Sequence, residues 1–230
     1  MHTLRLLPGL ILFAMGSAVA WTGADPVPLG SAAATSARPL TKIPVVKSTR
    51  DVRGLGLRDC VASAVLPGDV AVLACKHPAK DSAKDHGIRL CLLSEAAGVP
   101  EIRFESAGAG DAESAKIYVL SDAPQNDYVV IVADFAADLP FGTAVYQLSG
   151  KLLKKIGDIA LFQDLGDGDM GGVGPILTAE RDGAALRIRI HGKLLRPTRD
   201  GNFVPLPKGD AVFEYDGKVF APRQFNPAGT

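Results

Sequence analysis

Three aspartates near the middle of the chain are spaced by glycines in a pattern that suits cation binding. Asp164, Asp167 and Asp169 all lie in the segment 164–172. Calcium takes about six to eight oxygen ligands, and glycines let a short loop curl until alternate carboxylates converge. The segment therefore predicts a Ca²⁺ site with these three ligands. The alternative is an acidic, glycine-rich surface turn that binds nothing.

The same segment resembles the calcium loops of FG-GAP or VCBS-type β-propeller repeats, in which Asp recurs at alternate positions and strands follow. The resemblance covers about nine residues. Compared with those loops, the segment is one residue shorter between Leu165 and Gly166. Gly171 and Gly172 stand where those loops have their closing acidic residue. The resemblance implies a β-propeller-like fold with a degenerate calcium loop.

Histidines are the next candidates for chemistry. His77 and His86 bracket a polar loop that also holds Asp81 and Asp85, so a zinc site can be drawn there. The spacing matches no zinc signature, and we expect both histidines to be exposed loop residues. His191 ends a predicted strand on its outward face, and a catalytic role would need a partner that the sequence does not identify.

Acidic residues at the ends of predicted strands could supply a catalytic pair. Asp134, Asp138 and Glu180 are such residues, and two carboxylates across a sugar would suffice for glycoside hydrolysis. They are equally ordinary turn residues. The chain has no serine-nucleophile motif, and its one G-x-G-x-x-G, at 166–171, carries aspartates that would repel a pyrophosphate. We therefore predict a protein without catalytic residues.

An aromatic group surrounds the segment 139–142. Phe135, Phe141 and Tyr146 form it, and the loop between them is a candidate recognition surface. The alternative is that this apolar loop packs into the core.

The three cysteines predict one disulfide and one spare thiol in an oxidising compartment. A hairpin centred on residues 67–68 sets Cys60 opposite Cys75. Cys91, on the next predicted strand, could equally pair with Cys75.

The elements that must position these residues are strands. Strict alternation in 186–191 places Leu186, Ile188 and Ile190 toward a core, and Asp216-Gly217 predicts a hairpin. Helical periodicity is confined to one turn near 111–115. The fold class is all-β: an antiparallel meander, β-propeller-like or β-sandwich. The clearest runs are 70–75, 88–93, 116–120, 128–133, 143–148, 176–179, 186–191 and 211–215.

Strand–Gly–Lys–Leu–Leu occurs twice, at 145–153 and 187–195, with a spacing typical of a propeller blade. A chance match between two turns of a β meander is the alternative.

The first twenty residues have the pattern of a cleavable secretory signal. Arg5 precedes an apolar run at 6–15, and a small-residue segment ends at Ala20, so Trp21 is the expected mature N-terminus. Residues 21–50 read as a flexible leader rich in Pro, Ala and Ser. A β-rich domain, 51–230, follows, with a candidate break near 110–115.

Composition narrows the function. Removal of Arg5 leaves 24 basic and 25 acidic residues, without the basic cluster that nucleic acid or an anionic membrane requires. We predict a periplasmic or secreted, non-catalytic binding protein without a cofactor. An inhibitor or immunity protein whose partner is another envelope or secreted protein fits best. The alternatives are a calcium-binding, β-propeller-like envelope module and a cell-wall or polysaccharide hydrolase.

Overall fold

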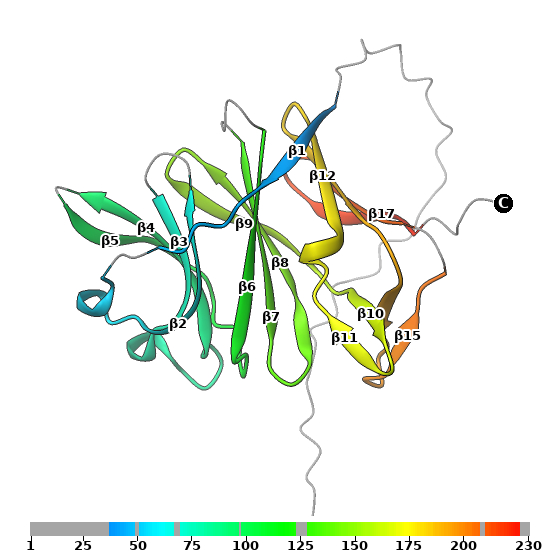
Figure 1. The fold of residues 1–230 in the computed structure, drawn as a ribbon, viewed down its shortest axis with the longest axis horizontal. Coiled ribbons are helices and arrows are strands. Elements are labelled where there is room, and N and C mark those ends of the chain that lie inside the picture. The colour runs from blue at the N-terminus through cyan, green and yellow to red at the C-terminus, as the bar shows by residue number, and fades with distance from the viewer. Residues whose placement is uncertain are drawn as a thin grey trace, which may run out of the picture. The chain divides into compact units, whose positions relative to one another are not determined.

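The computed structural model describes residues 37–48, 51–66, 70–96, 98–122, 128–207 and 210–225 (Figure 1). They belong to one compact unit, Thr35–Thr230. The predicted signal peptide, 1–20, and residues 21–36 of the predicted leader lie outside the described residues. The all-β, antiparallel prediction is confirmed. The described part adds only single-turn 3-10 helices to its strands: η1 (Arg53–Leu55), η2 (Pro78–Lys80) and η3 (Gly174–Ile176).

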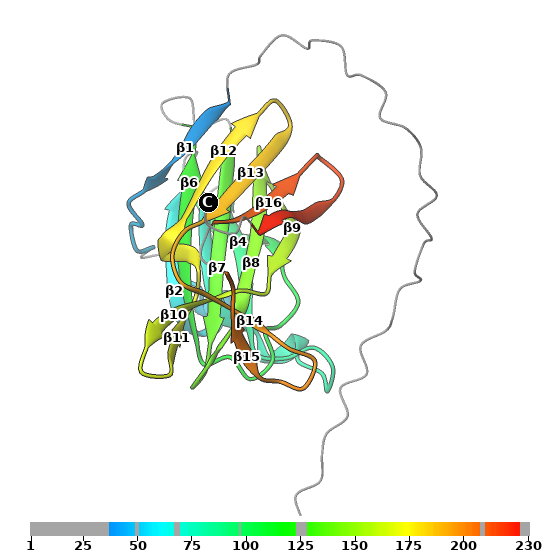
Figure 2. The same ribbon diagram turned by 90° about the vertical axis from the view of Figure 1, so that its right-hand side faces the viewer.

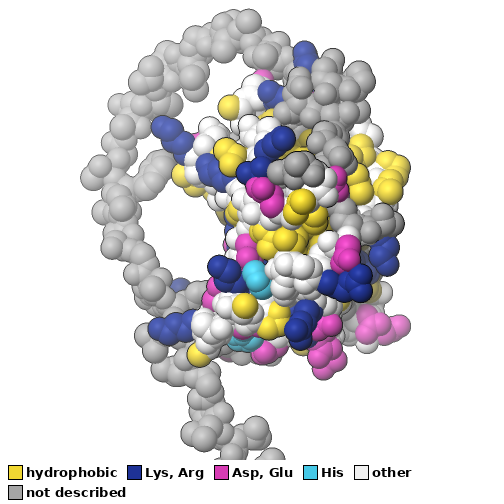
Figure 3. Space-filling view, turned by 90° about the vertical axis from the view of Figure 1, so that its left-hand side faces the viewer, with side chains coloured by type: hydrophobic (Ala, Val, Ile, Leu, Met, Phe, Trp, Pro, Cys, Tyr) yellow, Lys and Arg dark blue, Asp and Glu magenta, His cyan; other side chains and the backbone are white. Residues whose placement is uncertain are grey.

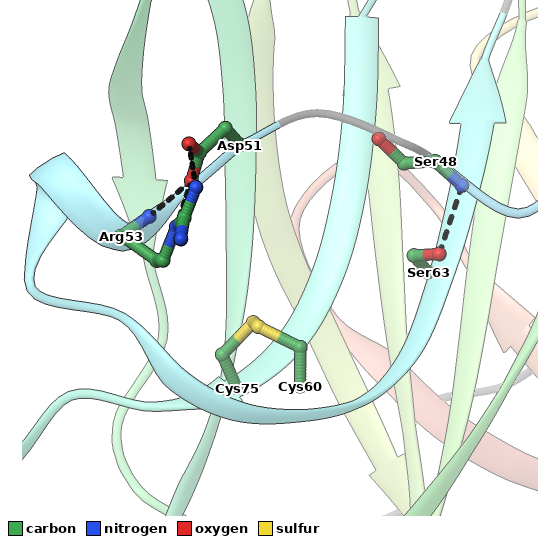
Figure 4. The surroundings of a disulfide bond; sticks show 6 residues. All are labelled: Ser48, Asp51, Arg53, Cys60, Ser63 and Cys75. Carbon is green, nitrogen blue, oxygen red and sulfur yellow. Dashed lines mark hydrogen bonds and ion pairs between the residues drawn. A yellow bond between two sulfur atoms is a disulfide. The ribbon is translucent and has the colours of Figure 1, made fainter.

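The first sheet is a meander of four consecutive strands. Its order is β2-β3-β4-β5: β2 (Arg58–Leu66), β3 (Val70–Lys76), β4 (Ile88–Ala96) and β5 (Val99–Glu105). The segment before β2 is tied to that strand, because the Ser48 N–H donates a 2.9 Å hydrogen bond to Ser63 Oγ (Figure 4).

The second sheet is nine-stranded and nearly closes into a barrel. Its order is β17-β16-β13-β12-β1-β6-β7-β8-β9. Strand β1 joins two meanders, because residues 38–40 pair with β12 and residues 41–43 pair with β6 (Figure 2). At the open side β9 meets β17, where Gly157 lies so close to the Phe220 ring that any side chain would overlap it. The strands are β1 (Arg38–Ile43), β6 (Ser114–Ser121), β7 (Val129–Ala136), β8 (Pro140–Ser149), β9 (Leu152–Ile159), β12 (Leu177–Asp182), β13 (Ala185–Ile190), β16 (Ala211–Tyr215) and β17 (Phe220–Phe225).

A small third sheet lies at one end of the barrel in both ribbon views (Figures 1 and 2). Its order is β11-β10-β14-β15: β10 (Phe162–Gly166), β11 (Asp169–Gly171), β14 (Leu194–Pro197) and β15 (Phe203–Pro205).

The strands β6–β9 form a middle layer with a core on each face. One core packs them against the first sheet, and includes Ile131 of β7 and Leu92 of β4. The other core fills the barrel, and includes Val132 of β7 and Ile188 of β13. Two covered faces explain why β7 reads Val-Val-Ile-Val-Ala without alternation, since such runs are typical of strands buried on both sides.

Several sequence predictions can be compared with this fold. Leu186, Ile188 and Ile190 are buried in the barrel, as the alternation predicts. The Asp216-Gly217 hairpin joins β16 to β17, through a longer connection, 216–219.

Two predictions need correction. Residues 38–43, part of the predicted flexible leader, form β1, because Leu40 of this strand is buried in the barrel core. The predicted helical turn near 111–115 is a turn that leads directly into β6, since its last residues already pair with β7.

The two Gly-Lys-Leu-Leu copies occupy different positions. The first forms the β8–β9 hairpin. The second leaves β13 for β14, which pairs with β10 and β15 instead. The candidate break near 110–115 falls in the connection from β5 to β6, and one core takes side chains from both sides of it.

The predicted disulfide is confirmed: Cys60 and Cys75 are bonded across β2 and β3, with their Cα atoms 4.0 Å apart (Figure 4). The predicted register is wrong by one residue at the turn, where Leu66 pairs with Val70. An irregularity in the first half of β2 shifts the register and brings the two cysteines opposite each other. Cys91 is a buried free thiol, and burial raises its pKa to about 12.

Candidate functional site

The predicted aromatic residues meet at the β7–β8 hairpin. Phe135 is the penultimate residue of β7, and Phe141 and Tyr146 lie on β8. All three line a cleft of about 320 Å³ that we call the aromatic cleft. Phe135 and Tyr146 are buried, whereas the Phe141 side chain is 48% exposed. The structure therefore brings the three residues together but presents only Phe141 to solvent.

The wall of the aromatic cleft is mainly apolar. Tyr146 packs edge-on against Phe104, with ring centroids 6.1 Å apart, and burial raises the Tyr146 pKa to about 12. The main charged feature is an ion pair, Lys155 Nζ to Asp158 Oδ1 at 2.8 Å. Such a cleft suits an apolar side chain of a partner better than a charged ligand.

A second cleft, of about 380 Å³, opens on the other side of Phe135. We call it the Asp134 cleft. It lies between the ends of β6 and β7 and the β10–β11 hairpin. Two exposed leucines line it, Leu139 at 52% and Leu165 at 58%. Its polar lining includes Lys116, Tyr118, Asp134, Asp138 and Gln163.

Asp134 is a buried carboxylate in this cleft. Thr143 Oγ1 donates a 2.5 Å hydrogen bond to its Oδ1, and the Gly174 N–H donates a 3.1 Å bond to its Oδ2. Burial raises the pKa of Asp134, while these two hydrogen bonds and the nearby Lys116 and Lys42 oppose the rise. Both carboxylate oxygens therefore have partners within the protein, which is the usual state of a structural buried acid.

Lys42 of β1 contacts two residues that line this cleft, Pro175 and Tyr118. Its Nζ donates to the carbonyl oxygens of Gly174 at 2.9 Å and Pro175 at 2.7 Å, and it lies 5.8 Å from the centre of the Tyr118 ring. Burial lowers the pKa of Lys42, and the Asp134 charge opposes that shift. Burial also raises the pKa of Tyr118 to about 12.

The calcium-loop candidates form a hairpin tip. Asp167 and Gly168 have φ values of 53° and 87°, typical of the two central residues of a type I′ turn between β10 and β11. Asp164 Oδ1 accepts a 2.9 Å hydrogen bond from the Gly166 N–H. No group of three metal-ligating side chains is found among the described residues. The calcium site with Asp164, Asp167 and Asp169 stays a prediction.

The three predicted strand-end acids do not meet. Asp134 and Asp138 share one cleft, but Glu180 lies on β12 and accepts a 2.9 Å hydrogen bond from Arg187 of β13. Arg187 also donates to Glu214 of β16 at 2.8 Å. Glu180, Arg187 and Glu214 share one register row across three strands. Opposite charges in such rows stabilise sheets.

His77 differs from its prediction as an exposed loop residue. It is buried, and its Nδ1 lies 2.9 Å from Glu105 Oε1. The same carboxylate oxygen lies 3.5 Å from Nε of the buried Arg89, which also pairs with Asp81 and Asp85. The polar loop 80–86 therefore folds around a buried arginine that sequence spacing alone does not reveal.

His86 lies 3.3 Å from Asp111 Oδ1 and is partly exposed. The face of the first sheet in Figure 3 shows histidine beside charged side chains, next to a central apolar patch. His77 and His86 thus pair with different acids, which argues against one shared zinc site. His191 has two side-chain partners, Thr178 and Asp210, that the sequence did not indicate.

Comparisons with known proteins give this chain no family. No protein-family model matches it, and neither the curated proteins nor the solved structures yield a significant match. The similarity of residues 164–172 to propeller calcium loops therefore stays a prediction.

Proposed function

We propose that this chain is an exported binding protein of the cell envelope, and that it holds its partner with the end of the β7–β8 hairpin and the adjacent strand β10. The observation that carries this proposal is the exposure of Leu139, Phe141 and Leu165 around two clefts. The best role for such a protein is that of a periplasmic inhibitor or immunity protein against an envelope-acting toxin or hydrolase.

The hairpin end has the properties of an interface hot spot. A few side chains that pack into pockets near the centre of a protein interface contribute most of its binding energy. Phe135 and Tyr146, which are buried beneath the exposed residues, hold the clefts in shape. A rigid surface lowers the entropy cost of association. We call Leu139, Phe141 and Leu165 the apolar tip.

The compartment follows from the disulfide. A Cys60–Cys75 bond indicates an oxidising, extracytoplasmic location. The described residues include no helix with the length and hydrophobicity of a membrane span. With the predicted signal at 1–20, these features support a partner that is met outside the cytoplasm.

The test is affinity capture from envelope extracts with the mature chain, followed by titration of the purified partner. We expect Leu139→Ser/Phe141→Ser to weaken that binding at least about 30-fold, the loss of about 2 kcal/mol that hot-spot residues typically give. Leu152→Ser is the matched control, because Leu152 is 75% exposed at the opposite end of the β8–β9 pair. Equal binding by both variants would refute the proposed surface.

A further inference from the structure

Three side chains at one edge of the barrel sheet form a continuous hydrogen-bond chain. Thr178 Oγ1 lies 3.1 Å from His191 Nε2, and His191 Nδ1 lies 2.8 Å from Asp210 Oδ1. A hydroxyl at one imidazole nitrogen and a carboxylate at the other is the arrangement of a nucleophile, its general base and the group that orients the base. Because Asp210 accepts at Nδ1, the Nδ1–H tautomer leaves Nε2 free to take the hydroxyl proton.

The topology explains why residues so far apart in sequence meet. Strands β12, β13 and β16 are neighbours in the sheet. At one end of these strands the last paired residues are Leu177, Ile190 and Ala211, which lie side by side. His191 follows the end of β13, and Asp210 precedes the start of β16. Thr178 lies one residue inside β12, on the face opposite to the buried Leu177. The three side chains therefore come from one strand end and two strand starts.

We propose that Thr178, His191 and Asp210 catalyse acyl-ester hydrolysis, an activity beyond the binding role proposed above. Thr178 Oγ1 attacks the ester carbonyl carbon while His191 Nε2 accepts its proton. The tetrahedral intermediate collapses, the carbon–oxygen bond to the alcohol breaks, and His191 returns the proton to the leaving alkoxide. A water molecule, deprotonated by His191, then hydrolyses the acyl-threonine and restores the hydroxyl. Asp210 is a positioning residue for the imidazole.

The surroundings indicate the class of substrate. The His191 and Asp210 side chains are 45% and 42% exposed, and Thr178 is also exposed, so the hydroxyl faces open solvent and not a closed pocket. Such a position admits an ester group that projects from a larger molecule, such as an O-acyl group on a polymer. Gly192 and Lys193 follow His191 and are exposed, and in this proposal their N–H groups hold the developing oxyanion.

The protein itself contains a control for a merely structural pair. His86 also lies against a carboxylate, with its Nε2 3.3 Å from Asp111 Oδ1, but has no hydroxyl partner among the described residues. An imidazole–carboxylate pair on a β surface is therefore not enough for the proposed activity, and His86→Ala should leave it unchanged.

The test is turnover of p-nitrophenyl acetate by the full mature chain, with mass spectrometry of the acylated protein. We expect an acetyl group on Thr178, and at least about 100-fold slower turnover in Thr178→Ala and His191→Ala, as removal of a general base or nucleophile typically gives. Thr178→Ser should retain turnover, because a primary hydroxyl at the same place is less hindered. Asp210→Asn should slow turnover and change the imidazole ¹⁵N shifts of His191 to those of the other tautomer.

Three results would overturn the proposal. One is turnover by the wild type no faster than by His191→Ala, and another is acetylation spread over surface lysines without Thr178. The third is an equal loss of turnover in His86→Ala and His191→Ala. Circular dichroism of each variant separates loss of folding from loss of the hydroxyl–imidazole pair. Loss of partner binding in Leu139→Ser/Phe141→Ser tests the other proposal, so the two can fail independently.

Discussion

Gly172 packs directly against the carboxylate of Asp134, so closely that a β-carbon on Gly172 would overlap Cγ and Oδ2 of the acid. The glycine that stands where a calcium loop would have its closing acid thus has a packing role here. It lets the chain after β11 pass over a buried carboxylate. Gly174, two residues later, has the same relation to the Tyr118 ring and donates its N–H to Asp134.

Gly172→Ala should therefore destabilise the protein. We expect the free energy of unfolding to fall by about 1–3 kcal/mol, the usual cost of overpacking a rigid site. The measurement is urea denaturation followed by circular dichroism. Gly54→Ala is the control, because a β-carbon on Gly54 would meet no atom within 4 Å. If both variants had the same stability as the wild type, the close packing of Gly172 would be contradicted.

Asp134 should give stability a pH dependence of a defined sign. Burial raises its pKa above the ordinary 3.8, so the folded protein favours the protonated acid. Its contribution to the free energy of unfolding is full below pH 3.8 and is lost as pH rises through the raised pKa. Asp134→Asn mimics the neutral acid. Relative to the wild type, this variant should gain stability across that window.

Thermal unfolding of both proteins over a pH series measures this difference. Asp138→Asn, which removes an exposed carboxylate at the same cleft, is the control for the loss of a negative charge there. If the difference in stability between Asp134→Asn and the wild type did not change with pH, Asp134 would ionise as freely in the folded as in the unfolded chain.

Arg89 should be among the most sensitive charged residues of the first sheet. Its side chain is 3% exposed and lies between Asp81, Asp85 and Glu105. Arg89→Met keeps much of the side-chain volume but leaves these acids without their cation, so we expect a loss of roughly 3 kcal/mol. Arg53→Met is the control, because Arg53 pairs with Asp51 in solvent (Figure 4). The measurement is the chemical denaturation midpoint of each variant, which should fall more in Arg89→Met than in Arg53→Met.

The disulfide should stabilise the first sheet mainly through the unfolded chain. Cys60 and Cys75 are separated by 15 residues, and closing such a loop contributes roughly 3 kcal/mol. Cys60→Ser/Cys75→Ser should lower the melting temperature and remove its sensitivity to reductant. Cys91→Ser should keep that sensitivity, since this buried thiol is outside the bond. Loss of the reductant sensitivity in Cys91→Ser as well would indicate the alternative pairing of Cys75 with Cys91.

The local sequence accounts for much of the fold. The alternation in 186–190 shows that one face of β13 is buried, and the unbroken apolar run of β7 shows that both of its faces are buried. In both strands the polarity of each residue indicates directly whether its side chain faces a core. Turn residues such as Asp216-Gly217 act through their own backbone preferences. These signals need no distant partner, so they can be recognised in one chain.

Other features depend on contacts that sequence spacing does not encode. The composition of β1 resembles that of a flexible leader, and the strand forms by pairing with β12 and β6, which are far along the chain. Its own residues therefore do not predict it. His77 looks like a surface histidine until Glu105 of β5 is placed beside it. The two clefts at Phe135 likewise need the β10–β11 hairpin and the 106–109 segment in position.

The sequence by itself determined the strand class and the inward faces, because each follows from local periodicity, whereas the structure decided between Cys60 and Cys91 as the partner of Cys75. Only the tertiary structure decided which chemically capable side chains meet. It separated Glu180 from Asp134, and it joined His191 to Thr178 and Asp210. The physical reason is that strand order and register, which long-range packing sets, bring residues many positions apart to the same sheet edge.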